Sequence, residues 1–232
     1  MTHAAGLIAL INRRHLRLIS LLAGVMPLAP LSARLDGLAP LQWPVDLRLS
    51  PEQFALVSAA NPEAVLELDA SGHLIRLTPT GGETGARNSR LLLRLLAWAE
   101  RVGGWQAFDS STGFRLPDGS VLSPDASLVR LDRWQALTPE QRRGFPPLCP
   151  DLVVELASSS DQGPRGLTAL RQKMRTYKAN GAQLAWLLIP EQQAVEVSSA
   201  AAETQRLEGV GTLEGGLLLP GLQIVLDEIW RV

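Results

Sequence analysis

The chain has 232 residues, of which 46% are hydrophobic and 19% are charged, a composition that excludes a disordered or fibrous protein. Its formal net charge of −1 excludes a globally basic nucleic-acid-binding domain, so any such surface has to be local. The single cysteine, Cys149, excludes an intrachain disulfide framework and a cysteine-rich zinc site, and it favours a reducing compartment, which we take to be the cytoplasm.

Residues 1–44 differ from the remainder of the chain. Three arginines, at positions 13, 14 and 17, precede the apolar run LISLLAGVMPLAPLSA, which has the outline of a secretory signal. Prolines and the shortness of the run weigh against a membrane span, which needs about 20 apolar residues. We expect a poorly ordered extension or a misplaced start first, a signal peptide second and a membrane anchor last, followed by one domain over residues 45–232.

The first predicted elements of that domain are a short helix, a hairpin and a long helix. SPEQFALVSA predicts the short helix, with Ser50 as N-cap and Gln53 placed for a capping box. VLELDASGHLIRLTP alternates apolar and polar residues on either side of an Asp-Ala-Ser-Gly turn, which predicts the hairpin. NSRLLLRLLAWAERV predicts an amphipathic core helix. Its apolar stripe consists of Leu91, Leu92, Leu95, Ala99 and Val102.

The second half of the domain is predicted to consist mainly of strands. WQAFDSSTGFRL and GSVLSPDASLV predict two strands joined at Pro117-Asp118-Gly119. A polar insertion, DRWQALTPEQRRGFPPLCP, separates them from LVVELAS, which is apolar and β-branched enough for a central strand. A helix from Leu167 to Asn180, the strands AWLLIP and AVEVSS, and an extended tail from Gly216 complete one mixed α/β domain.

Two acidic residues lie in predicted strands. Alternation with period two sets Asp125 on one face of SPDASLV and Glu155 on one face of PDLVVELAS. If the strands are neighbours, the two carboxylates can converge on a hard cation such as Mg²⁺. Each acid also has a structural interpretation, because Asp125 follows Pro124 at a turn and Glu155 could pair with an arginine.

Lysine is rare in this chain, since only Lys173 and Lys178 among the 22 basic residues are lysines. A compact ammonium suits catalysis better than a broad guanidinium. The helix that carries both lysines has an apolar stripe that is spaced to pack on the sheet, and the lysines border it on opposite edges. The stripe consists of Leu167, Leu170, Met174 and Tyr177. Lys178 lies beside Arg171 and Arg175 on a basic helix face that is typical of exposure to solvent, whereas Lys173 stands one turn from Tyr177 without a basic neighbour. Periodicity alone assigns a catalytic role to neither lysine.

The order and spacing of four passages make up a specific sequence pattern. The passages are ELDASGHLIRLTPTGGETGARNSRLL, FDSSTGFRLPDGSVLSPDASLVRLDRW, CPDLVVELASSSD and QKMRTYKANGAQLAWLLIP. With them the chain resembles the Uma2 family of the PD-(D/E)xK superfamily, over about Leu49 to Trp230. The resemblance implies an α/β fold of the restriction-endonuclease-like type, a mixed β-sheet flanked by helices.

The resemblance also implies a site. It assigns Asp125, Glu155 and Lys173 as catalytic residues, with Asp125 and Glu155 as ligands of Mg²⁺ or Mn²⁺. In the superfamily the lysine normally follows two residues after the strand acid, and here Ala157 occupies that position. In the family the lysine is placed on the next helix, which selects Lys173. The broken strand pattern bears on the strength of catalysis more than on the fold.

Two further positions match the family. Glu67 corresponds to a common glutamate, where related nucleases sometimes add a metal ligand, although a hairpin glutamate is most often solvated. Asn88 corresponds to a histidine of other family branches, and its alternative role is that of an ordinary residue near a helix start.

We therefore expect a magnesium-dependent endonuclease that hydrolyses nucleic-acid phosphodiester bonds, with DNA as the first substrate. The alternative is a nucleic-acid-binding or regulatory module of the same fold with weak or lost catalysis. A third hypothesis is a homo-oligomeric scaffold that uses exposed tryptophans of the insertion, such as Trp134. The expected partner is nucleic acid and not a membrane. The sequence does not decide between a monomer and a homodimer. Substrate specificity would come from loops such as residues 131–150 or from a partner protein.

Overall fold

The computed structural model describes residues 44, 46–161, 163–200 and 202–232, without the side chains of residues 164 and 165. The chain divides into the units Met1–Pro44 and Val45–Val232, and every described helix and strand belongs to the second unit. The predictions of an extension, signal or anchor were made for residues 1–44, which lie outside the described residues except for residue 44. Across the described part of the chain, no helix is long and apolar enough to cross a membrane.

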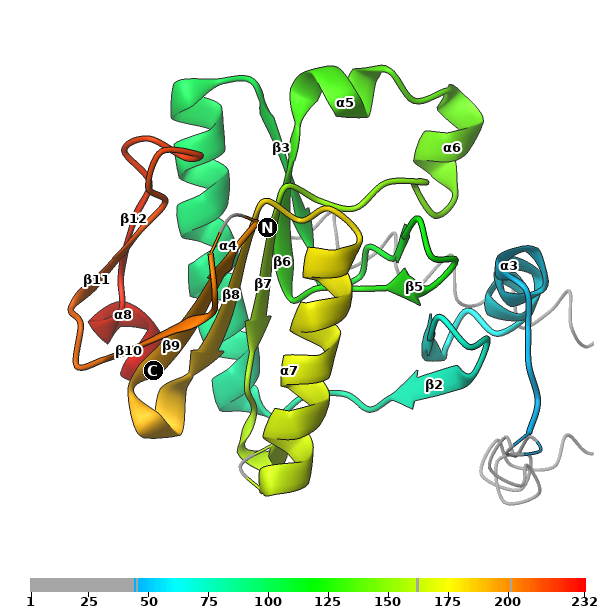
Figure 1. Cartoon of the computed structure of the whole chain (residues 1–232), viewed down its shortest axis with the longest axis horizontal. Coiled ribbons are helices and arrows are strands. Elements are labelled where there is room, and N and C mark those ends of the chain that lie inside the picture. Colours follow the sequence, from blue (N-terminus) through cyan, green and yellow to red (C-terminus); the bar gives the residue numbers. More distant parts are fainter. Residues whose placement is uncertain (1–43, 45, 162, 201) are drawn as a thin grey trace, which may run out of the picture. The chain divides into compact units, whose positions relative to one another are not determined.

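A six-stranded mixed sheet in the order β10-β9-β8-β7-β6-β3 forms the centre of this unit (Figure 1). Only β7 and β8 pair in parallel, and the other neighbours are antiparallel. The two parallel strands are buried along their whole length, which confirms the prediction of a central strand in LVVELAS. The strands are β3 (Trp105–Asp109), β6 (Ala126–Arg130), β7 (Leu152–Leu156), β8 (Leu184–Ile189), β9 (Ala194–Ser199) and β10 (Gln205–Glu208).

The helices α4 (Gly82–Val102) and α7 (Pro164–Ala179) cover opposite faces of the large sheet (Figure 1). On one face, Leu91 and Leu95 of α4 pack with Val154 of β7. On the other face, Met174 and Tyr177 of α7 pack with Val153. Consecutive residues of β7 thus enter different cores, as strand alternation requires, and the face that holds Val153 is also the face of Glu155.

A smaller sheet in the order β2-β1-β5-β4 lies beside the large one (Figure 1). Its strands are β1 (Val65–Leu68), β2 (Leu74–Leu77), β4 (Phe114–Arg115) and β5 (Val121–Leu122), and the helix α3 (Pro51–Ala60) precedes them. The predicted capping box of Ser50 and Gln53 is present in α3. The predicted hairpin of β1 and β2 is also confirmed. It needs a glycine at its turn, because Gly72 has φ +82° and a Cβ atom there would lie 2.8 Å from the carbonyl oxygen of Leu49.

The prediction of two strands between residues 105 and 129 is wrong, because this segment forms four. Asp109 accepts hydrogen bonds from the backbone N–H and the hydroxyl of Ser111, and this turn ends β3. The chain then crosses from the large sheet to the small one and returns through β6. Only the connection at Pro117-Asp118-Gly119 is the predicted hairpin turn, between β4 and β5.

The insertion after β6 contains α5 (Leu131–Gln135), which packs on the domain through Trp134, and α6 (Pro139–Arg143), whose residues are all exposed. Trp134 is half-buried, and its ring meets that of Phe108 edge-on with centroids 5.0 Å apart. The prediction of an exposed Trp134 is therefore wrong, because β3 provides an aromatic partner that the sequence did not reveal. The remaining elements are η1 (Ser159–Asp161), η2 (Pro190–Gln192), β11 (Thr212–Glu214), β12 (Gln223–Val225) and α8 (Asp227–Trp230).

Candidate active site

The three predicted site residues come from adjacent elements at one end of the large sheet. Asp125 directly precedes β6, Glu155 lies near the end of β7, and Lys173 lies in α7. The strands β6 and β7 are antiparallel neighbours with Ala126 opposite Val154, so Asp125 and Glu155 are the next residues along the two strands. The condition set by the sequence, that the two acid-bearing strands are neighbours, is met.

Glu155 is buried beneath α7, where the side chains of two α7 residues reach the same oxygen. Its Oε1 lies 2.9 Å from the Nζ of Lys173 and accepts a hydrogen bond of 3.3 Å from the hydroxyl of Tyr177. Tyr177 was predicted only as part of a packing helix, and its hydroxyl is a polar contribution that sequence reasoning missed. The strand carboxylate thus pairs with the lysine ammonium and not with an arginine.

Lys173 has a hydrogen-bond acceptor for each of its three ammonium hydrogens. Its Nζ lies 2.8 Å from Glu67 Oε1, 2.9 Å from Glu155 Oε1 and 2.9 Å from the carbonyl oxygen of Ser123. The side chain is 15% exposed, and the two carboxylate side chains are 4% and 5% exposed. This is a buried charged cluster, in which electrostatic interactions are much stronger than at the surface.

The charged groups of the cluster shift one another's pKa values. Burial, reinforced by the nearby Asp125 and Glu67 and opposed by Lys173, raises the pKa of Glu155 to about 8. Burial alone would lower the pKa of Lys173, but the carboxylates of Glu155 and Glu67 outweigh it and raise this pKa above its usual value. Lys173 is therefore charged at neutral pH. Glu155, when no further cation lies beside it, is mostly protonated at pH 7.

Asp125 is half-buried and takes one hydrogen bond on each carboxylate oxygen. Oδ1 accepts from the side-chain amide of Asn88 at 3.1 Å, and Oδ2 accepts from the backbone N–H of Leu156 at 2.7 Å. Burial raises the pKa of Asp125, against the effect of these hydrogen bonds and of Lys173. The bond to Leu156 ties Asp125 to the strand position next to Glu155.

Glu67 is the largest difference from the sequence prediction within the site. A solvated hairpin glutamate was the favoured alternative, but Glu67 is buried and contacts Lys173 directly. Strand alternation places Glu67 on the other face of β1 from the apolar Leu66 and Leu68, which predicts that its side chain is exposed to solvent. The structure instead covers that face with the segment before β6 and with α7.

The residues at this end of the sheet fit a divalent cation. Among the described residues, no group of three or more His, Cys, Asp or Glu side chains has the arrangement of a metal site. However, the amide oxygen of Asn88 is buried and has no hydrogen-bond partner in the described structure, although its amide nitrogen binds Asp125. A buried acceptor without a donor suits a hydrated cation beside Asp125 and Glu155, since Mg²⁺ combines one or two carboxylates with water and neutral oxygens.

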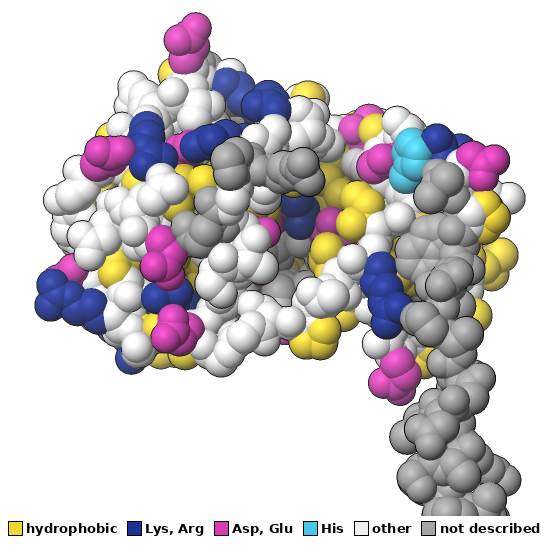
Figure 2. Space-filling model, turned by 90° about the horizontal axis from the view of Figure 1, so that it is seen from below, with side chains coloured by type: hydrophobic (Ala, Val, Ile, Leu, Met, Phe, Trp, Pro, Cys, Tyr) yellow, Lys and Arg dark blue, Asp and Glu magenta, His cyan; other side chains and the backbone are white. Residues whose placement is uncertain are grey.

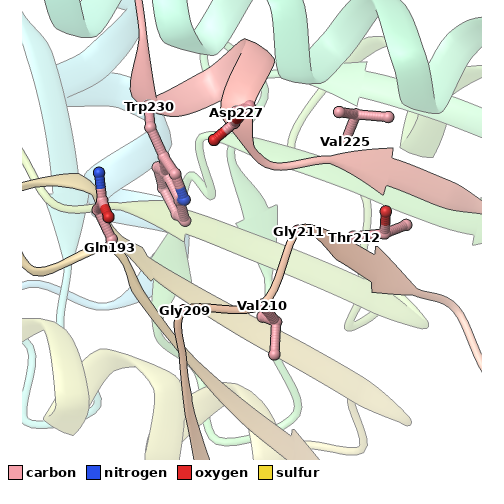
Figure 3. A pocket seen from close by; sticks show the side chains of 8 residues that line it. All are labelled: Gln193, Gly209, Val210, Gly211, Thr212, Val225, Asp227 and Trp230. Atoms are coloured by element: carbon pink, nitrogen blue, oxygen red, sulfur yellow. The ribbon is translucent and has the colours of Figure 1, made fainter.

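The face of the molecule seen in Figure 2, which is the lower side of Figure 1, has a hollow in which basic and acidic side chains lie together between hydrophobic ones. A separate pocket of about 450 Å³ lies by the C-terminal elements, with the side chains of Trp230, Asp227 and Gln193 at its wall (Figure 3). None of the predicted site residues lines that pocket.

Comparison with known proteins supports this interpretation of the fold. A model of the Uma2 family, described as "Putative restriction endonuclease", matches residues 51–227. A crystal structure of "a putative nuclease belonging to DUF820" from Anabaena variabilis resembles this chain with a TM-score of 0.63. At 19% identity the match covers 78% of this chain and 97% of that one, and it confirms the predicted fold class. No curated protein matches. The chain therefore belongs to the Uma2 family.

Proposed function

We propose that this protein is a metal-dependent endonuclease that hydrolyses phosphodiester bonds, with DNA as its substrate, through Asp125, Glu155 and Lys173. The observation that carries the proposal is the direct contact of a buried ammonium with a strand carboxylate, next to the strand that brings the second acid. Membership of a family described as "Putative restriction endonuclease" supports the same reaction class.

The charge of the cluster supports a divalent cation. With all groups ionised, three carboxylates (Glu67, Asp125 and Glu155) and one ammonium (Lys173) sum to −3 + 1 = −2. A charge of this size is unfavourable in a buried site, and without a further cation Glu155 avoids it by holding a proton. One Mg²⁺ or Mn²⁺ ion would balance it, which is a reason for these acids to be kept together at the end of the sheet.

Each residue has a distinct role in the proposal. Asp125 and Glu155 hold the cation, and Asn88 offers a neutral oxygen beside Asp125. When bound, the cation supplies Lewis-acid activation of water and neutralisation of phosphate charge. Lys173 stabilises negative charge that develops on the phosphate oxygens. Because Ala157 occupies the usual lysine position in the strand, α7 supplies the ammonium from above the same face.

Cleavage of plasmid and single-stranded DNA in Mg²⁺ or Mn²⁺ tests the proposal. We expect Asp125→Asn, Glu155→Gln and Lys173→Met to lose activity by a factor on the order of 10² or more. Lys178→Met is the matched control, because it removes the only other lysine, whose Nζ contacts a surface carbonyl oxygen of Ala202. An inactive but folded wild type, or equal activity of wild type and the three site variants, would refute the catalytic proposal.

A second function, a nucleic-acid-binding module without catalysis, is favoured by one observation. Every ammonium hydrogen of Lys173 already has a protein acceptor, so this lysine can also act as a purely structural ion pair. Calorimetric titration separates the two functions, since the module would bind DNA without a cation, whereas the nuclease site predicts metal binding that depends on Asp125 and Glu155.

The cellular setting belongs to the proposal as well. We place the protein in the cytoplasm, because a chain with one cysteine has no intrachain disulfide to gain from an oxidising compartment. A homodimer would allow two strands of a duplex to be cut by two copies of the site. Sedimentation of the protein with and without duplex DNA tests this part of the proposal.

A further inference from the structure

Glu67 links three separate segments of the site through one carboxylate oxygen. Its Oε1 accepts hydrogen bonds of 2.8 Å from the backbone N–H of Ser123 and of 2.8 Å from the ammonium of Lys173. That ammonium in turn donates to the carbonyl oxygen of Ser123 at 2.9 Å. The three groups form a closed ring that joins β1 of the small sheet, the segment before β6 and the helix α7.

The ring fixes both the lysine and one acid of the proposed site. A lysine side chain has four rotatable bonds, so an ammonium borne on a helix needs partners on more than one side to stay in place. Glu155 holds Lys173 from the large sheet, and Glu67 holds it from the small sheet. Because Ser123 precedes Asp125 by two residues, the same ring also anchors the backbone that carries this carboxylate.

We propose that Glu67 is a positioning residue that holds the helix-borne Lys173 against Glu155. Its consequence for cleavage rests on the proposed function, but its effect on Lys173 does not. A lysine at the position of Ala157, two residues after Glu155, would be held close to Glu155 by the backbone of the strand. The lysine of this chain lies on α7, and Glu67 holds it there instead. Its Oε1 contacts Ser123 and Lys173, so the positioning role needs no contact between Glu67 and a metal.

The direct test uses the fact that Lys173 and Lys178 are the only two lysines of the chain. Selective labelling with ¹⁵N-lysine gives one ammonium signal for each, and Lys178 serves as an internal reference. In the wild type we expect the Lys173 ammonium to be protected from exchange with water, because it is buried and fully hydrogen-bonded. Lys178 is expected to exchange fast.

Two substitutions of Glu67 are expected to reduce the protection of the Lys173 ammonium to different extents. Glu67→Gln keeps an acceptor oxygen without the charge and is expected to speed the exchange of the Lys173 ammonium, whereas Glu67→Ala is expected to abolish its protected signal. Glu63→Gln is the matched control, since it changes an exposed glutamate of the same region, and it should leave both lysine signals in place. Unchanged protection of Lys173 in folded Glu67→Gln and Glu67→Ala would overturn the proposal.

Kinetics and metal titration separate positioning from metal binding. In an active wild type, Glu67→Gln should lower kcat by about tenfold or more and leave KM and the Mg²⁺ affinity within about twofold. A metal ligand or its direct partner would instead lose metal affinity by about 10- to 100-fold, and that result would contradict the positioning role. If the wild type cleaves no DNA, the proposed function fails, and the lysine signals still decide the role of Glu67.

Discussion

Removal of the Lys173 ammonium offers a quantitative test of the buried cluster. Lys173→Met keeps most of the side-chain volume and leaves Glu67 and Glu155, which are 4% and 5% exposed, without their shared counter-charge. Breaking a buried pair by removal of one partner costs about 3–5 kcal/mol of the free energy of unfolding. We expect the lower half of this range at pH 7, because Glu155, with a pKa already raised to about 8, escapes part of the cost by keeping its proton.

The loss should depend on pH in a defined direction. A carboxyl whose pKa is higher in the folded than in the unfolded protein opposes folding once the pH rises above its unfolded value, which is 4.5 for Glu155. Removal of the ammonium raises that pKa further, so Glu155 stays protonated in folded Lys173→Met at pH values where it ionises in the folded wild type. The difference between the two proteins should therefore be nearly constant from pH 5 to pH 7 and should widen as the pH rises through about 8. Urea denaturation followed by circular dichroism at several pH values measures it.

Two variants complete this experiment. Lys173→Met combined with Glu67→Gln removes one of the stranded carboxylates and should recover part of the stability, which gives a double-mutant coupling well above the 0.5 kcal/mol of independent sites. Lys178→Met should change the free energy of unfolding by no more than about 0.5 kcal/mol. A loss below about 1 kcal/mol for Lys173→Met at pH 8 would refute the strong interaction within the cluster.

Three further results are expected. Mg²⁺ binding at pH 7 should release close to one proton, since Glu155 has a pKa of about 8 and must ionise to bind metal; calorimetry in two buffers of different ionisation heat measures this, and no release would contradict the role of Glu155. Glu196 has a lowered pKa because of its hydrogen bonds with Arg171, so its contribution to stability is present above pH 4.5 and lost as the pH falls through its lowered pKa. With Arg171 39% exposed, Glu196→Gln should cost only about 1 kcal/mol at pH 7 and nothing in strong acid, as urea titrations at both pH values would reveal. Gly72→Ala should lower the free energy of unfolding by about 1–2 kcal/mol, because of its φ of +82° and the close backbone of Leu49, and an unchanged melting temperature would count against this strain.

The strand acids could be predicted because their signals are local. Alternation places Val153 and Glu155 of β7, and Ala157 just after the strand, on one face, and the structure has that face beneath α7. The apolar run of this strand likewise indicated its central place in the sheet. By contrast, the selection of Lys173 over Lys178 depended on the family resemblance, because both border the same helix stripe.

Other parts of the site depend on contacts between distant segments. The burial of Glu67 is set by α7 and by the segment of Ser123, about 100 and 56 residues further along the chain, and alternation within β1 contains no trace of them. The spacing of Tyr177 predicted only apolar packing, and its hydrogen bond to Glu155 depends on the position of β7 beneath α7. The four strands between residues 105 and 130 were missed because a turn at Asp109 sends consecutive strands to different sheets.

The central claim is that Asp125 and Glu155 hold a divalent cation beside the Lys173 ammonium. The most direct measurement is a crystal structure of the protein soaked in Mn²⁺, with the ion located by its anomalous scattering. The proposed site predicts one Mn²⁺ ion with oxygen ligands from both Asp125 and Glu155, and no ion there in crystals of Asp125→Asn. A saturating soak that leaves these two carboxylates without metal, or that places the ion elsewhere, would contradict the account.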